Sequence, residues 1–262
     1  MPDSSTERST GQGRFDPEEW AVRVDLAACY RLIDHFGLTD LIYNHITARV
    51  PGQGEAFLIN PYGLRYDEIR ASDLVKVDLE GNLLAPSPYP INPAGYTIHS
   101  AIHAARHDVF CVIHTHSPAG SAVSCLKDGF MPLTQAGLQF HNRLAYHDYE
   151  GIALDLAERE RLVADFGSYH SMILRNHGLL TTGTTIAEAF KRIYYLEQAC
   201  QLQMQVLASG REIVQPSDEV MERTARQFEG GGASSVMGTG RKVSAWDAYL
   251  RLLDEKSPDY RT

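Results

Sequence analysis

The sequence predicts a mixed α/β protein built around one mainly antiparallel sheet. Helical and strand-like patterns interleave along the 262 residues, and the first two expected strands form a hairpin. No glycine-rich fingerprint follows a strand and opens a helix, so a dinucleotide-binding unit has no support. No internal repeat and no long linker divides the chain, which indicates a single domain.

The elements follow from capping residues and hydrophobic spacing. Asp16 caps a first helix that begins with Pro17 and two acids, and Gly37 ends it. A turn rich in proline and glycine joins the two strands of the hairpin. The expected strands are 46–50, 56–60, 74–78, 109–114 and 171–175, and the later expected helices are 94–106, 155–166, 186–209 and 246–253.

The ends of the chain are expected to differ from the domain between them. Residues 1–15 are polar and predict a disordered tail, and residues 16–262 form the single domain, with 211–262 as a C-terminal extension packed on it. The formal charge of −9 argues against a nucleic-acid or anionic-membrane surface. No apolar run reaches the roughly 20 residues that span a bilayer. Four scattered cysteines and the lack of an apolar leader indicate a cytoplasmic protein.

Two histidines follow the apolar run that ends at residue 113. Alternate residues of a strand point to the same face, so His114 and His116 are expected side by side as part of a metal site. Zinc-like metals take three or four ligands, and His177, after the strand at 171–175, is the candidate third. His177 would join the pair if the strand at 171–175 lies next to the strand that leads to His114. The alternative is that these histidines only form hydrogen bonds with buried backbone groups. Five others are expected at the surface: His35, His103, His107, His147 and His170.

Three blocks, INPAGYTIHSAIHAAR, CVIHTHSPAG and LRNHGLLTTG, resemble the class II aldolase/adducin superfamily, and the similarity runs from about residue 20 to residue 210. The resemblance implies a three-layer α/β/α sandwich and a homotetramer with active sites at subunit interfaces. It also implies one divalent metal ion per chain on His114, His116 and His177. Zinc is expected, although imidazole also accepts manganese, cobalt, nickel or iron. The segments YNHITARV and FLINPYGLRYDEI resemble the family's N-terminal half, whose pocket-shaping asparagine and glycine correspond to Asn44 and Gly63.

The sequence departs from the sugar-phosphate aldolases and epimerases of this family at two places. Their acidic residue, four positions before the histidine that corresponds to His99, is replaced by Gly95. Their phosphate-holding serine pair corresponds to Pro93 and Ala94. Proline has no backbone N–H to donate, and alanine has no hydroxyl. The chain is therefore expected to be an atypical member that does not act as a standard sugar-phosphate aldolase.

The predicted function is a divalent-metal-dependent carbon–carbon lyase for a small non-phosphorylated oxo or hydroxy acid. A metal on three neutral imidazoles keeps its full charge and can stabilise an enolate formed by aldol cleavage or decarboxylation. His99 is the candidate for proton transfer or for a hydrogen bond to the substrate; the alternative is that it orients neighbouring loops. Gln135, Gln139 and His141 lie in a polar loop that is expected to select the substrate.

Two other functions fit the same residues. Three histidines with open coordination positions also hold iron(II), so a non-haem oxygenase acting on an aromatic oxo acid is one alternative. A non-enzymatic, adducin-like interaction module is the second, although nothing structural demands all three histidines together. The expected partner is a small-molecule substrate, with no nucleic acid and no membrane.

Overall fold

A computed structural model describes residues 13–151, 156–230 and 244–262 of the chain. The disordered tail expected at residues 1–15 lies outside these ranges except for its last three residues. In the described part, no helix is both long enough and apolar enough to cross a membrane.

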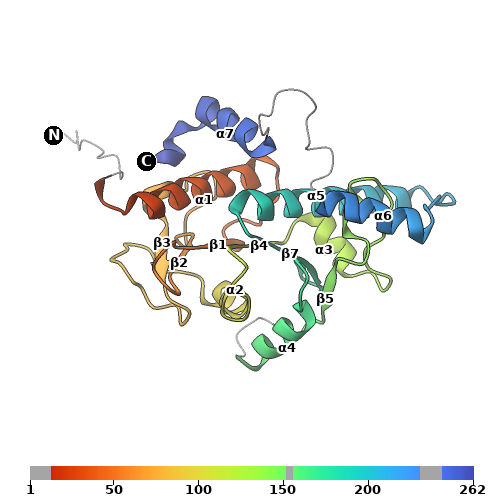
Figure 1. Cartoon of the computed structure of the whole chain (residues 1–262), viewed down its shortest axis with the longest axis horizontal. Helices are drawn as coiled ribbons and strands as arrows, with labels where there is room; N and C mark the ends of the chain where they lie inside the picture. The colour runs from red at the N-terminus through yellow and green to blue at the C-terminus, as the bar shows by residue number, and fades with distance from the viewer. Residues whose placement is uncertain (1–12, 152–155, 231–243) are drawn as a thin grey trace.

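A seven-stranded sheet forms the centre of the fold, in the order β3-β2-β1-β4-β7-β6-β5 (Figure 1). Five neighbouring pairs are antiparallel, and β5 pairs in parallel with β6. The predicted α/β class with a mostly antiparallel sheet is therefore confirmed. The strands are β1 (His45–Arg49), β2 (Phe57–Ile59), β3 (Val75–Val77), β4 (Cys111–Thr115), β5 (Ala145–His147), β6 (Ser171–Leu174) and β7 (Gly178–Gly183).

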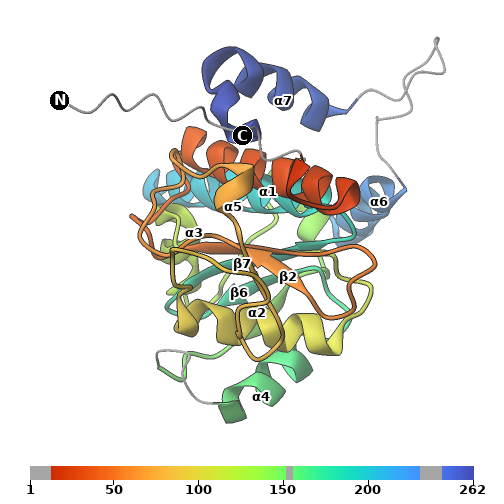
Figure 2. The same cartoon turned by 90° about the vertical axis from the view of Figure 1, so that its left-hand side faces the viewer.

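Helices cover both faces of the sheet and produce three layers (Figure 2). Helices α1 (Pro17–His35) and α5 (Ile186–Ala208) lie on one face, and α2 (Pro93–Ala105) and α4 (Leu156–Phe166) lie on the other. The short helix α3 (Pro118–Ser124) packs against α5. The remaining helices are α6 (Asp218–Glu229), which packs near residues 137–140, and α7 (Ala245–Lys256), which lies over α1.

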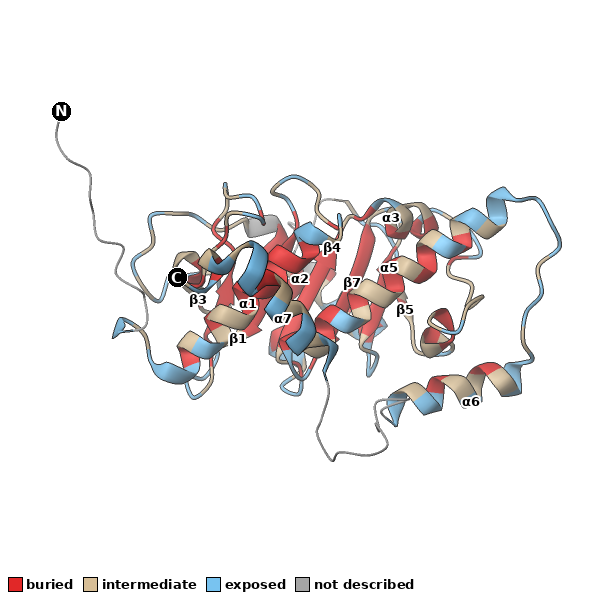
Figure 3. Ribbon diagram, turned by 90° about the horizontal axis from the view of Figure 1, so that it is seen from above, coloured by how far each residue is buried: buried red, intermediate tan, exposed pale blue. Residues whose placement is uncertain are grey.

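Alternating side chains of the strands fill a hydrophobic cluster on each face of the sheet. In β4, Cys111 and Ile113 join the cluster beneath α1 and α5, and Val112 joins the cluster beneath α2 and α4. Both faces are thus covered, and the central strands are buried along their whole length, as Figure 3 shows in red. Burial of this apolar surface is the main stabilising contribution to the fold.

Local signals set the ends of the first helix where the sequence predicts them. The side chain of Asp16 accepts hydrogen bonds from the backbone amides of Glu18 (2.9 Å) and Glu19 (3.4 Å). Gly37 has a φ of 67°, which favours glycine and ends the helical path. At the other end of the chain, the buried Arg31 of α1 donates to Ser257 and Asp259 just beyond α7, so these contacts join α1 to the C-terminal segment.

Several elements differ from the sequence prediction. Helix α3, which begins at Pro118, and strand β7, which begins at Gly178, lie outside the expected helices and strands. Strand β5 and helix α6 are also additional elements. Both β5 and α3 are too short for a clear hydrophobic period, and β7 contains two glycines that weaken its strand signal.

Candidate metal centre

Three histidine side chains meet at one end of the central strands. His114 lies in β4, His116 directly after it, and His177 in the turn between β6 and β7. Their Nε2 atoms are 2.8 Å apart for His114 and His116, 2.9 Å for His116 and His177, and 3.2 Å for His114 and His177. The structure therefore brings together the three residues expected to hold a metal.

The route by which His177 reaches the site differs from the expectation. The sequence predicts convergence only if the strand at 171–175 lies next to the strand of His114, but β7 lies between them and pairs with β4. Asn176, with a φ of 54°, reverses the chain, and Gly178 starts β7 against Thr115. A Cβ at residue 178 would lie 2.3 Å from the carbonyl oxygen of Thr115, so the close approach requires glycine.

Hydrogen bonds fix the tautomers of two of the three rings. Nδ1 of His114 donates to the carbonyl oxygen of Leu179 (2.9 Å), and Nδ1 of His116 donates to Oδ2 of Asp40 (2.9 Å). In a neutral ring whose Nδ1 carries the hydrogen, Nε2 keeps a free lone pair. These lone pairs point at the shared space between the rings, and outer partners of this kind are typical of metal-binding histidines.

The geometry fits one divalent ion. Metal–nitrogen distances of about 2.0–2.1 Å place neighbouring ligand nitrogens about 2.8–3.4 Å apart in tetrahedral or octahedral arrangements. All three measured separations fall in this range. Lone pairs this close repel one another unless a cation lies between them, so the donor set is suited to a metal.

Burial keeps the imidazoles of His114 and His177 in the neutral form that binds metals. Desolvation lowers the pKa of His114 well below its usual value, and the neighbouring histidines add to the effect. Desolvation, with a contribution from His116, also lowers the pKa of His177 to about 4. Protons therefore compete weakly with a metal at neutral pH.

A cavity of about 420 Å³ opens beside the three histidines. Polar groups of its wall come from Asp40, His45, Asn92 and Asn176. The described residues that line it include no lysine and no arginine. A ligand here would therefore meet the three histidines, one carboxylate and neutral hydrogen-bonding groups.

His45 lines this cavity, and the sequence reasoning missed it. The antiparallel register places His45 opposite His114, with ring centroids 5.2 Å apart. Desolvation, followed by His99, lowers the pKa of His45 well below its usual value, so the ring is neutral. His45 follows Asn44 in the block YNHITARV, and this position was the sequence signal that could have placed it at the pocket. The pairing of β1 with β4 is not visible in the sequence.

Two of the expected pocket residues lie behind the wall. His99 is fully buried and is not among the described lining residues, because His45 stands between it and the cavity; Nε2 of His99 is 2.9 Å from Nδ1 of His45. Asn44 is also buried, and its Oδ1 accepts a hydrogen bond from the backbone amide of Asp40 (2.6 Å). Both residues support groups that do reach the cavity. 

The remaining expected substrate contacts lie elsewhere in the chain. Gly63 occupies a turn with a φ of 110°. It is not among the described residues that line the cavity beside the three histidines. Gln135 is exposed, and His141 contacts Asn142. Gln139 lines a separate cavity of about 670 Å³.

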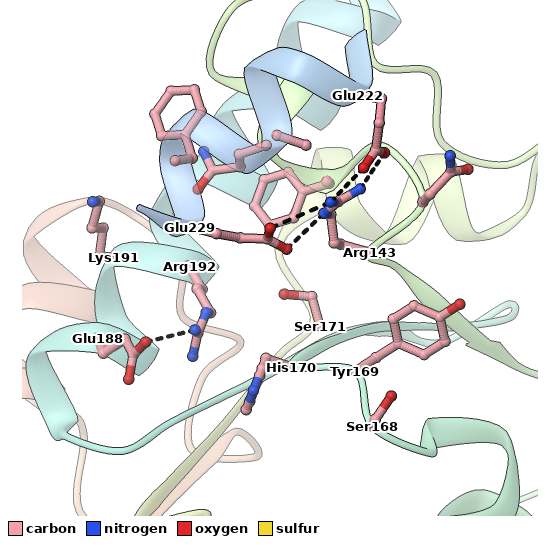
Figure 4. Close-up of a pocket in the computed structure, with 15 residues that line it drawn as sticks. Arg143, Ser168, Tyr169, His170, Ser171, Glu188, Lys191, Arg192, Glu222 and Glu229 are labelled. Atoms are coloured by element: carbon pink, nitrogen blue, oxygen red, sulfur yellow. Dashed lines mark hydrogen bonds and ion pairs between the residues drawn. The ribbon is translucent and has the colours of Figure 1, made fainter. Parts of the chain in front are cut away.

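That separate cavity lies beside α5 and α6 (Figure 4). Its arginines are already paired. Arg143 donates to Glu222 (2.8 Å) and to Glu229 (2.8 Å), and Arg192 bonds Glu188 (2.6 Å). The ion pairs of Arg143 hold α6 against the segment that carries Arg143, whereas the pair of Arg192 and Glu188 lies within α5. Neither arginine is left as a strong anion site.

Two histidines expected at the surface are buried, so that prediction was wrong for them. His103 lies one helical turn after His99 in α2, faces the sheet, and its Nε2 is 2.8 Å from Oγ1 of Thr47. His147 lies in β5, and its Nδ1 is 2.7 Å from Oδ2 of Asp165. Tertiary hydrogen bonds stabilise both rings in the interior.

Comparisons with known proteins agree with this fold. The family model described as Class II Aldolase and Adducin N-terminal domain matches residues 24–204. A "Putative aldolase class 2 protein" of Pseudomonas aeruginosa is 50% identical over 250 residues, which cover 95% of each chain. Alpha-adducin of Rattus norvegicus is 46% identical over 257 residues, which cover 95% of this chain and 35% of the adducin.

Solved structures give the same result. The crystal structure of an aldolase II superfamily protein from Pseudomonas syringae has a TM-score of 0.88 and 49% identity, covering 97% of this chain and 100% of that one. L-fuculose 1-phosphate aldolase from Glaciozyma antarctica has a TM-score of 0.79 and 26% identity, covering 94% of each chain. The chain belongs to the class II aldolase and adducin family.

Proposed function

We propose that the chain is a divalent-metal-dependent carbon–carbon lyase acting on a small, non-phosphorylated oxo or hydroxy acid. The observation that carries this proposal is the convergence of three Nε2 atoms within 3.2 Å of one another. Leu179 and Asp40 orient the rings of two of these histidines, His114 and His116. Zinc is the metal we expect for such a nitrogen-rich site.

The residues of the site have distinct roles in this proposal. His114, His116 and His177 would hold the ion, which when bound supplies Lewis-acid stabilisation of the negative charge that develops as a carbon–carbon bond breaks. Asp40 fixes the ring of His116, and Leu179 fixes that of His114. Tyr43 and Tyr149 at the mouth of the cavity limit access of water to the reacting atoms.

The absence of a cation from the described cavity wall supports a substrate without a phosphate. A phosphate dianion requires several hydrogen-bond donors or positive side chains, and the described wall carries one carboxylate and no lysine or arginine. Gly95 also leaves no acidic side chain at the position that the sugar-phosphate enzymes use. We therefore propose that the activity differs from that named for the relative L-fuculose 1-phosphate aldolase.

Elemental analysis followed by a substrate screen tests the proposal. Chelator-treated protein reconstituted with zinc, manganese or cobalt should hold about one ion per chain and cleave one of a set of 2-oxo and 2-hydroxy acids. Fuculose and ribulose phosphates should react very slowly or not at all. Efficient cleavage of the phosphates would contradict the substrate class, and iron-dependent oxygen consumption with an aromatic oxo acid would favour the oxygenase.

The similarity to alpha-adducin favours a second function, a non-enzymatic interaction module. The two functions differ in their need for metal. A protein that retains no ion after reconstitution, with the three histidines intact, would favour the module over the lyase.

We also propose a homotetramer in the cytoplasm. Gln135, Gln139 and His141 are remote from the three histidines of their own chain, which supports a role at a neighbouring subunit's site. Light scattering coupled to size exclusion should give about four times the mass of the 29.2 kDa chain.

A further inference from the structure

The ring of His45 fills the space that a side chain at residue 95 would need. An ideal Cβ built on Gly95 would lie 1.9 Å from Cδ2 and 2.0 Å from Nε2 of His45. Such separations are far below van der Waals contact, so a side chain at 95 and the present position of His45 exclude each other. The large ring on β1 and the missing side chain on α2 are therefore complementary.

A buried series of hydrogen bonds holds the ring of His45 from behind. Nδ1 of His45 is 2.9 Å from Nε2 of His99, and Nδ1 of His99 is 2.9 Å from Oγ1 of Thr47. The same hydroxyl lies 2.8 Å from Nε2 of His103. These bonds engage the inner nitrogen of His45 and leave the Nε2 edge next to Gly95, which lines the cavity.

The ring reaches the cavity only by an edge. His45 is 3% exposed and nevertheless belongs to the cavity wall, as does Gly95. Each bond in the buried series can run in either direction, so Nε2 of a neutral His45 presents either a hydrogen or a lone pair. A substrate oxygen bound next to His114 would meet this group rather than an acid.

We propose that His45, given room by Gly95, is the residue that hydrogen-bonds the substrate from the cavity wall beside the three-histidine centre. The inference rests on the proposed function and deepens it, because it assigns the selection of a chelating 2-oxo or 2-hydroxy acid to a neutral imidazole. His99 is then a positioning residue that acts through His45.

Oxalate, a two-oxygen chelator, is a suitable probe for zinc-loaded protein. Zinc content per chain is measured by elemental analysis, and oxalate affinity by calorimetry, for wild type, His45→Ala and Gly95→Ala. Both variants should retain about one zinc. Both should bind oxalate about 3- to 10-fold more weakly, the range expected for one lost neutral hydrogen bond.

Gly230→Ala is the matched control, because its new Cβ would make only ordinary contacts, 3.5 Å or more from any neighbouring atom, far from the cavity. It should bind oxalate as wild type does. His45→Gln, whose side chain retains an amide, should recover part of the affinity and replaces His45→Ala if that variant fails to fold.

The outcomes separate the inference from the proposed function. Zinc-loaded variants that bind oxalate like wild type would overturn the inference and leave the lyase standing. If only Gly95→Ala bound oxalate with wild-type affinity, Gly95 would not be what provides the space for the ring of His45. Wild-type protein without bound zinc would overturn the metal function and the inference that depends on it.

Discussion

At the scale of single residues, the proposed metal ligand His177 is positioned by a turn rather than by a strand. His177→Ala should reduce the metal content from about one ion per chain to near zero. The fold should remain, since the two large hydrophobic clusters do not include this ring. Elemental analysis and circular dichroism measure both effects.

His35→Ala is the control for this substitution. His35 is exposed at the end of α1, and its loss should leave the metal content unchanged. A wild-type metal content in His177→Ala would remove His177 from the proposed ligand set.

Asp40 would act on the proposed metal through His116. Asp40→Asn replaces the carboxylate that lies 2.9 Å from Nδ1 of His116 and should weaken metal affinity about 10- to 100-fold, as is typical for outer partners of metal ligands. A competition titration with a chromogenic chelator measures the change. Asp67→Asn, an exposed acid paired with Arg65, should have no effect, and equal affinities for all three proteins would contradict the role of Asp40.

At the scale of elements, the approach of β7 to β4 depends on Gly178. In Gly178→Ala the new Cβ would lie 2.3 Å from the carbonyl oxygen of Thr115, so one of the paired strands must move. We expect a loss of about 1–3 kcal/mol in the free energy of unfolding, the range for overpacking, together with weaker metal binding. Urea unfolding of metal-free protein and chelator competition measure the two effects.

Gly230→Ala is again a suitable control, because the added methyl has room at the end of α6. If Gly178→Ala were as stable as the control, the backbone at the junction of β4 and β7 would be far more adaptable than its close contact indicates.

At the scale of the whole molecule, buried histidines make stability depend on pH. Desolvation is the largest cause that lowers the pKa of His45, His99 and His103 well below the ordinary value near 6.5. Below pH 6.5 the unfolded chain therefore binds protons that the folded chain does not. The free energy of unfolding should fall as the pH is lowered from about 7 to 5, by up to about 1.4 kcal/mol per pH unit for each such group.

His103→Gln isolates one of these contributions without touching the metal site. As the pH falls, the unfolding free energy of its metal-free form should decrease less steeply than that of wild type. The difference in slope should be up to about the contribution of one proton. Urea unfolding at several pH values measures this slope, and His35→Gln at an exposed position should leave it unchanged. Equal slopes for wild type and His103→Gln would show that His103 takes up its proton in the folded protein.

Much of the fold was predictable because its signals are local. The cap at Asp16, the stop at Gly37 and the apolar runs of β4 and β6 each act within a few residues, and those elements lie within one or two residues of their expected limits. Short or glycine-containing elements such as α3 and β7 were missed, since their local preferences are weak and packing decides their structure.

The sequence by itself determined the class of the fold, the family motifs and the identity of three histidines suited to a metal, because residue type and short spacing carry that information. Only the tertiary structure decided which groups face the cavity. His45 reaches it and His99 does not, because the pairing of β1 with β4 and the missing side chain at Gly95 leave room for one ring. Strand register and close packing join residues 50 to 80 positions apart, and no local pattern records such distances.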